Sequence, residues 1–263
     1  GKLNSAGNAG TTGNGSAGVL ILGANNIVGG TTAADRNIVA GNQNGVVISG
    51  GAASGNQVIG NYIGINYAGT VAIANVAAGV VVTNGASGNS IGGGNTNQRN
   101  VIAGNGDAAI VIDGGASAGT IVKGNWLGVS ADGTARIANG GSGILVYNGP
   151  ANSQIGGSGA NDGNWIVGCT KNGIELNGAS SGTLIQGNRI GTDLAGTANW
   201  GCQWNGVMIG TSLGGAGPSS SRVIGNTIGF SGQGGPYSGI KVDAPAGAGN
   251  TLSVNSLYSS AGP

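Results

Sequence analysis

The side chains that could carry acid–base, nucleophilic or metal chemistry are few in this sequence. It has 263 residues, of which eight are Asp or Glu, nine are Lys or Arg and none is His. A serine nucleophile would lack its usual histidine base. Asp113 and Asp243 share one position of the repeat described below but lie four repeats apart, roughly 19 Å at the ~4.8 Å spacing of strands, whereas the carboxylates of a glycosidase lie roughly 5 to 10 Å apart. They cannot act as an acid–base pair, and we assign no catalytic residue.

Two further carboxylates stand in patterns that could have a function. Glu175 matches Lys241 two repeats further on, and we interpret it as a solvated residue on the face of a strand. The segment Gly156–Asp162 resembles a calcium-binding glycine-rich nonapeptide, but its Asp is displaced by one position and no second copy stacks on it. The segment is therefore predicted to be a corner of the chain, and we expect no metal and no cofactor.

Aromatic side chains are the candidates for a binding surface. Trp165, Trp200 and Trp204 are three of the four tryptophans and lie in one region of the sequence. Aromatic faces are platforms for sugar rings, yet a long loop also needs apolar anchors, so packing and carbohydrate binding both remain open for them. Tyr62 and Trp126 begin equivalent strands two repeats apart, roughly 10 Å, a separation that suits neighbouring sugars.

The two cysteines, Cys169 and Cys202, fall in the same region, at the end of one predicted strand and in the long loop of the next repeat. Neighbouring repeats bring these regions close together. An even number of cysteines in a secreted chain favours a disulfide, and two buried thiols are the alternative.

A repeating unit must position these side chains. A small residue followed by branched apolar residues at alternate positions recurs eight times, at spacings of 27 to 34 residues. Each unit holds two further apolar bursts bounded by Gly and Asn, which indicates three short strands and no helix. Units alternate between two types, one with a loop between its second and third strands and the other with a long loop after the third. The eight copies begin at Gly18, Gly45, Gly79, Ala109, Gly143, Gly173, Gly206 and Gly239.

Three strands per unit predict an all-β solenoid, a single domain over residues 1–263, in which each coil pairs in parallel with the next. Inward residues should stack as columns. Asn61, Asn125, Asn188 and Asn226 share one offset, so they either form a ladder of side-chain hydrogen bonds or serve only as turn formers. One pair of columns is predicted to run from Val19 and Ile21 to Ile240 and Val242, and another through Ile27, Val58, Ile91, Val122, Ile155, Ile185, Val223 and Leu252.

The pattern Asn-x-Ile-x-Gly-Asn followed by Gly-Ile-x-Ile resembles the right-handed parallel β-helix repeat proteins of the pectate-lyase-like group, particularly the Gly/Asn-rich repeat proteins secreted by bacteria. The resemblance covers almost the whole chain and implies a right-handed parallel β-helix of about eight three-stranded coils. It is weak for function, because the same coil hosts polysaccharide lyases, hydrolases, epimerases, tailspikes, adhesins and surface proteins. Hydrolases and epimerases of the group use Asp with His, and this chain has no His.

Composition limits the partners. A net charge of +1 without a Lys/Arg cluster predicts no nucleic-acid partner, and no apolar run approaches the ~18 residues that cross a bilayer, so we expect no membrane insertion. Any export signal is expected to have been removed, which places the protein in the secreted class, extracellular or at the cell surface.

The chain starts and stops at one phase of the coil and offers no capping helix, which predicts either a longer parent chain or end-to-end self-association. We therefore expect an extracellular structural scaffold, a component of a filament, sheath, matrix or surface adhesin. The alternative is a carbohydrate-binding module or a divergent polysaccharide lyase that uses the aromatic residues above.

Overall fold

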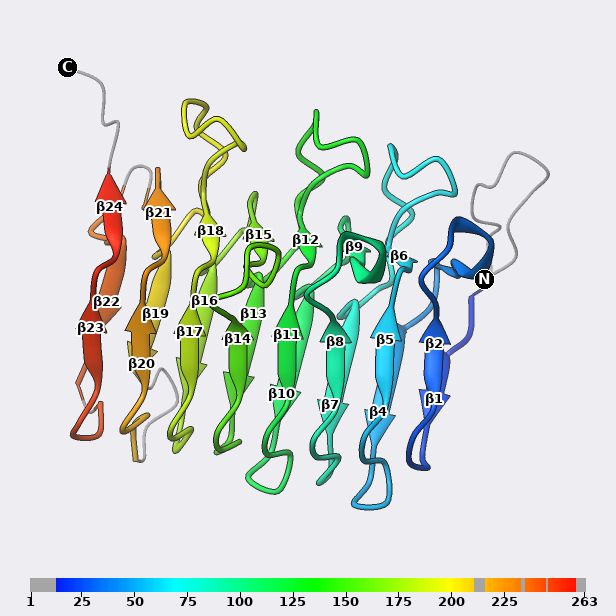
Figure 1. Cartoon of the computed structure of the whole chain (residues 1–263), viewed down its shortest axis with the longest axis horizontal. Helices are drawn as coiled ribbons and strands as arrows, with labels where there is room; N and C mark the ends of the chain where they lie inside the picture. Colours follow the sequence, from blue (N-terminus) through cyan, green and yellow to red (C-terminus); the bar gives the residue numbers. More distant parts are fainter. Residues whose placement is uncertain (1–12, 211–215, 233–234, 245, 259–263) are drawn as a thin grey trace.

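The computed structural model describes residues 13–210, 216–232, 235–244 and 246–258, which form a stack of short coils (Figure 1). Each coil contributes one strand to each of three eight-stranded sheets, and all strands within a sheet pair in parallel. Strand order in every sheet follows the order of the coils along the chain. The predicted parallel solenoid of about eight three-stranded coils is confirmed.

The strands divide by their position in the coil. The first sheet contains β1 (Ala17–Ile21), β4 (Asn44–Ser49), β7 (Val80–Thr83), β10 (Ile110–Asp113), β13 (Ile144–Tyr147), β16 (Ile174–Asn177), β19 (Val207–Gly210) and β22 (Ile240–Val242). The second contains β2 (Ile27–Gly29), β5 (Gln57–Ile59), β8 (Ser90–Gly92), β11 (Ile121–Lys123), β14 (Gln154–Gly156), β17 (Leu184–Gln186), β20 (Arg222–Ile224) and β23 (Thr251–Ser253). The third contains β3 (Ile38–Val39), β6 (Tyr62–Ile63), β9 (Val101–Ile102), β12 (Trp126–Leu127), β15 (Trp165–Ile166), β18 (Arg189–Ile190), β21 (Thr227–Gly229) and β24 (Ser256–Tyr258).

The interior is built from the predicted columns of branched side chains. In the first sheet the column pair that starts at Val19 and Ile21 continues in register to Ile240 and Val242, as expected. Because the strands pair in register, each inward side chain packs on its counterpart in the next coil. The inward side chains of the middle coils are therefore fully buried.

The predicted second-sheet column is wrong at its first member. Val28, not Ile27, pairs with Val58, and Ile27 is 61% exposed. The corner before the strand sets this register, because the backbone N–H of Asn26 donates to Oδ1 of Asn56 at 2.8 Å. The sequence offers two adjacent branched residues here, so alternation alone could not choose between them.

The asparagines do form a ladder. At the corner between the second and third sheets, each Asn donates from Nδ2 to Oδ1 of the Asn in the next coil, at 2.9 to 3.1 Å. The four predicted members are thus part of a longer run. The ladder is formed by Asn37, Asn61, Asn100, Asn125, Asn164, Asn188, Asn226 and Asn255.

The two predicted types of unit are also present. Long loops after β6, β12 and β18 project from one edge of the stack (Figure 1), and each is closed by an antiparallel bridge, as between Val129 and Arg136. Their turns contain Gly69, Gly133 and Gly196 with φ of 73°, 73° and 79°, a left-handed conformation that glycine adopts freely. In the other type of unit, the 3-10 turns η1 (Ala33–Asp35) and η2 (Thr96–Gln98) lie between the second and third strands. Within the described ranges, no helix has the length and apolar character to span a bilayer.

Candidate functional site

A groove of about 420 Å³ lies over the outer face of the first sheet. Its floor is one outward row of register partners, Leu145 on β13, Glu175 on β16, Met208 on β19 and Lys241 on β22. The row crosses the strands and therefore runs along the axis of the stack. We call this hollow the sheet groove; its floor row and the loop residues Lys171, Trp204 and Tyr237 define it.

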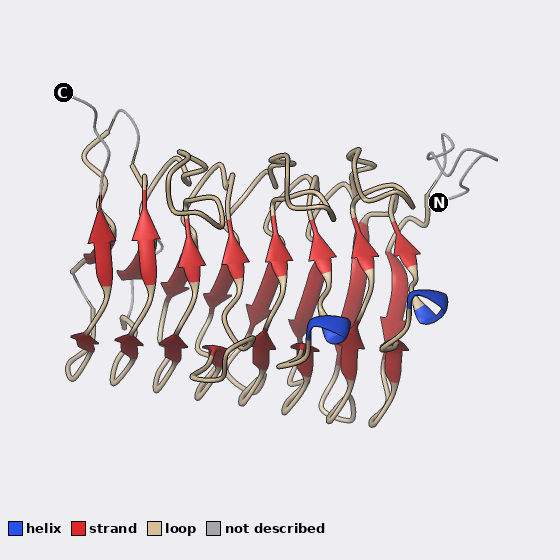
Figure 2. Cartoon of the chain, turned by 45° about the horizontal axis from the view of Figure 1, so that its top comes forward, coloured by secondary structure: helices blue, strands red, loops and turns tan. Residues whose placement is uncertain are grey.

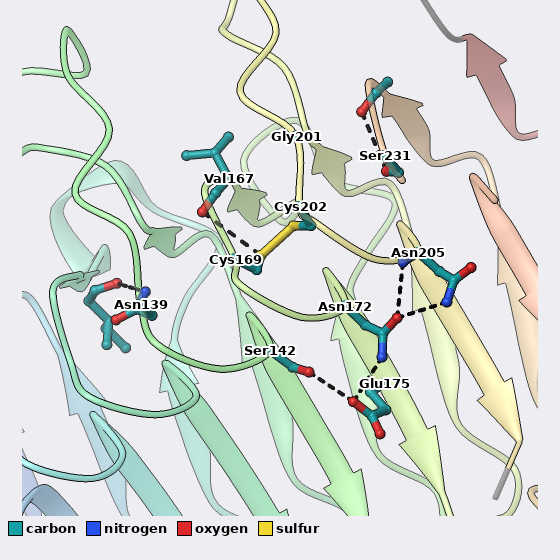
Figure 3. Close-up of a disulfide and its surroundings, with 12 residues drawn as sticks. Asn139, Ser142, Val167, Cys169, Asn172, Glu175, Gly201, Cys202, Asn205 and Ser231 are labelled. Carbon is teal, nitrogen blue, oxygen red and sulfur yellow. Dashed lines mark hydrogen bonds between the residues drawn. A yellow bond between two sulfur atoms is a disulfide. The ribbon is translucent and has the colours of Figure 1, made fainter. Parts of the chain in front are cut away.

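Glu175 is held in place at the centre of the floor. Its carboxylate accepts hydrogen bonds from Ser142 Oγ at 2.8 Å, Asn172 Nδ2 at 2.9 Å and Asn177 Nδ2 at 3.2 Å, and Figure 3 shows the first two. Glu175 lies on the outer face of β16, as interpreted, but it is half-buried and hydrogen-bonded and not freely solvated. Oε1 accepts only one of the three bonds, so it retains acceptor capacity for a ligand hydroxyl.

Two stacked rings form one side of the sheet groove. Trp204 and Tyr237 lie with centroids 6.0 Å apart and planes inclined by 16°, and they are 37% and 39% exposed. Sequence reasoning selected Trp204 and missed Tyr237, since the two lie on loops of successive coils. Exposed, nearly parallel rings offer an apolar face to a sugar.

Charge in the sheet groove is mixed. Lys241 pairs with Asp243 at 2.8 Å, and the exposed Lys171 also lines the groove. Burial raises the pKa of Tyr147, and the nearby carboxylate of Asp113 raises it further. A hydrogen bond to the Asp113 carboxylate contributes to the same rise in pKa, so the Tyr147 hydroxyl already has an acceptor within the protein.

The other predicted aromatic residues lie on a different face. Trp165 contacts the edge of Trp126 at 5.0 Å between centroids and stacks on Trp200 at 5.6 Å. Trp165 is only 2% exposed, and its Nε1 donates to the carbonyl of Thr192 at 2.7 Å. This ring therefore anchors the long loop after β18, and the three tryptophans do not converge on one site.

Tyr62 and Trp126 are two strands apart in the third sheet, as predicted, but a guanidinium covers each ring. Arg36 lies 4.0 Å from the ring centroid of Tyr62, and Arg99 lies 4.2 Å from that of Trp126. A sugar stacked on either covered face would have to displace an arginine.

In the structure a disulfide joins Cys169 and Cys202, which follow the neighbouring strands β15 and β18 (Figure 3). Their Cα atoms are 4.4 Å apart and both side chains are buried. The backbone N–H groups of Gln203 and Trp204 donate to the carbonyls of Cys169 and Lys171 at 2.9 and 3.1 Å. The bridge thus fixes the segment that carries one ring of the sheet groove.

No known protein-family model and no curated protein sequence match this chain. Among solved structures, it is similar to the periplasmic alginate epimerase AlgG, with a TM-score of 0.60 and 14% sequence identity over 84% of this chain and 44% of AlgG. A point mutant of AlgG aligns with a TM-score of 0.58 at 16% identity, over 85% of this chain and 43% of the mutant. The chain has the pectate-lyase-like right-handed β-helix fold. It spans less than half the length of AlgG, and identity this low shows the fold alone.

The glycine-rich segment Gly156–Asp162 forms a corner of the β-helix, as predicted. The Asp162 carboxylate pairs with Lys123 Nζ at 3.3 Å and accepts the backbone N–H of Gly159 at 3.1 Å. Both contacts are within the protein and hold the loop against β11. In the described part of the β-helix, no three acidic or cysteine side chains gather as a metal site would require.

Proposed function

We propose that this β-helix is an exported protein that binds a polysaccharide chain in the sheet groove. The observation that carries the proposal is the meeting of a stacked aromatic pair, Trp204 and Tyr237, with the oriented carboxylate of Glu175 in one hollow. Aromatic faces take the apolar faces of sugar rings, and a few fixed polar groups take the hydroxyls.

The composition of the groove favours a neutral glycan. Glu175 retains acceptor capacity for sugar hydroxyls, and the Lys241 cation is already paired with Asp243. The floor row runs along the stack over the four strands from β13 to β22, roughly 14 Å at the spacing of neighbouring strands, so an extended sugar chain would lie across the coils.

Two observations support export and a link to polysaccharide. AlgG, which shares the fold, is a periplasmic alginate epimerase. A disulfide is also typical of proteins that work in oxidising compartments.

Binding of soluble neutral polysaccharides, measured by calorimetry with xyloglucan, mannan and a mixed-linkage β-glucan, tests the proposal. We expect at least one of these glycans to bind. Tyr237→Ala, which removes a stacking ring, and Glu175→Gln, which removes a hydrogen bond to a charged group, should each weaken this binding by about 10-fold or more. Tyr67→Ala is the matched control, because Tyr67 is 62% exposed on the loop after β6, away from the groove. Binding of none of the glycans, or equal affinity of Tyr237→Ala and Tyr67→Ala, would refute the proposal.

A structural scaffold that assembles end to end is the second candidate. It rests on the last described coil, where Val242, Leu252 and Leu257 continue the interior columns and yet are 46%, 45% and 53% exposed. A further coil, from a second copy or from a longer parent chain, would cover these side chains.

A further inference from the structure

Three arginines form a row at the corner between the second and third sheets. Arg36 and Arg99 directly follow the 3-10 turns η1 and η2, which Figure 2 shows on the same side of the stack. They precede β3 and β9, two strands apart in the third sheet, and Arg189 begins β18, three strands beyond β9. We call these residues the arginine row.

The arginine row forms no ion pair with a carboxylate in the described part of the chain. Among the described residues the ion pairs are Lys123 with Asp162 and Lys241 with Asp243, and neither involves the row. Arg36 and Arg189 each donate to a backbone carbonyl, at 3.3 and 3.4 Å. Nε of Arg99 is buried and has no hydrogen-bond partner among the described residues. Burial lowers the pKa of Arg99, since the charged form lacks solvent there.

Two hollows connect the row. One of about 220 Å³ is lined by Arg36, Tyr62 and Arg99, and one of about 480 Å³ is lined by Arg99, Trp165 and Arg189. The larger hollow also includes Gly163 in its lining. Gly163 occupies the position before the ladder asparagine that Arg99 and Arg36 occupy two and four coils earlier, so this coil places no arginine between Arg99 and Arg189. A Cβ at Gly163 would overlap the carbonyl oxygen of Gly187, so the close approach of the next coil requires glycine here.

We propose that an acidic polysaccharide lies along the arginine row, with its carboxylate or sulfate groups on the guanidinium groups. The planar fork of an arginine binds such oxyanions through two parallel hydrogen bonds. An anion near Arg99 would also give its buried Nε–H a partner. The row stands at the edge of the third sheet and the sheet groove on the first, so this inference does not depend on the proposed neutral-glycan site.

The aromatic contacts favour a glycan over a nucleic acid. The row presents one cation every two or three coils, roughly 10 to 14 Å, so it contacts only some of the charges of any polyanion. Arg36 and Arg99 also cover faces of Tyr62 and Trp126, so these rings do not offer the open platforms on which single-stranded bases stack. An acidic glycan can place some of its carboxylate or sulfate groups on the row without needing such platforms.

The test measures binding of polygalacturonate, alginate and chondroitin sulfate to the whole chain at low salt, with dextran as the neutral polymer and polyuridylate as the nucleic acid. We expect at least one acidic glycan to bind and salt to weaken it. The double variant Arg99→Gln/Arg189→Gln should lose about 10-fold or more in affinity. The matched double Arg136→Gln/Arg222→Gln removes the same charge from two exposed positions off the row and should stay within about twofold of the parent.

The inference is overturned if none of the three acidic glycans binds, if polyuridylate binds as tightly as the best of them, or if the two double variants are equal. Should the first double variant fail to fold, Arg99→Lys/Arg189→Lys retains the charge and removes the planar fork, and a loss of affinity relative to the parent is again expected. Tyr237→Ala should leave binding of the acidic glycan unchanged, which separates this site from the sheet groove.

Discussion

Asn125 connects three successive coils through one side chain. Its Nδ2 donates to the carbonyl of Ile91 in the preceding coil at 2.9 Å and to Oδ1 of Asn164 in the following coil at 3.0 Å. Its own Oδ1 accepts from Asn100 at 2.9 Å. Because the side chain is fully buried, each of these groups depends on its protein partners in place of water.

We expect Asn125→Ala to lower the free energy of unfolding by about 3 kcal/mol or more, since leaving a buried polar group unpaired costs about 1–3 kcal/mol and more than one group is affected. Urea unfolding followed by circular dichroism measures this loss. Asn97→Ala at an exposed position is the control and should change stability by less than about 0.5 kcal/mol. Equal stability of the two variants would show that the ladder contributes little.

The cysteines give a second prediction at the residue scale. Titration of the unfolded, unreduced protein should detect no free thiol, because Cys169 and Cys202 are bridged in the structure. Two reactive thiols per chain would contradict the bridge and weaken the inference of export. After reduction, we expect weaker glycan binding in the sheet groove, because the bridge holds the segment that carries Trp204.

At the scale of the strands, the sequence allowed most of the fold to be predicted, because each burst places branched residues at alternate positions and is bounded by Gly and Asn. The exception at Ile27 arose where two adjacent branched residues left the register to a hydrogen bond at the preceding corner. The site was less predictable. Glu175 and Tyr237 acquire their surroundings from loops of neighbouring coils, and pairing between loops leaves no periodic signal in the sequence.

Val122 on β11 tests the inward assignment of a whole sheet. It is fully buried between Ile91 and Ile155, so Val122→Asp should place an unpaired charge in the interior and prevent folding. Gln57→Asp changes an exposed residue of β5 and should fold normally. Thermal melting monitored by circular dichroism measures both, and a soluble Val122→Asp variant with an unchanged melting temperature would reject the assignment.

At the scale of the molecule, each coil pairs only with its two neighbours, so stability is close to a sum of coil and interface contributions. The last described coil has a neighbour on one side only. Leu252 and Leu257 are therefore exposed, although the members of their columns in the preceding coils are buried.

If the chain assembles end to end, it should sediment as oligomers that resist salt, because apolar burial and not ion pairing would hold them. Leu252→Lys/Leu257→Lys should then release monomers or short oligomers. Val71→Lys/Leu194→Lys, which changes two loop residues that are each 55% exposed, should leave the oligomers intact. A parent chain that remains a stable monomer at high concentration would rule out assembly through this end.

The alternation of coils with and without a long loop after the third strand makes two coils, and not one, the unit by which this rod can grow. Equivalent loop glycines are 64 and 63 residues apart, at Gly69, Gly133 and Gly196. A gene duplication or deletion of one such pair would keep every projecting loop on its edge and every Asn in its ladder. Loss of a single coil would instead make two coils of the same type neighbours, for example two coils that both carry a long loop. The length of the rod can therefore vary in evolution or be set by an engineer in steps of about ten ångströms without redesigning a strand.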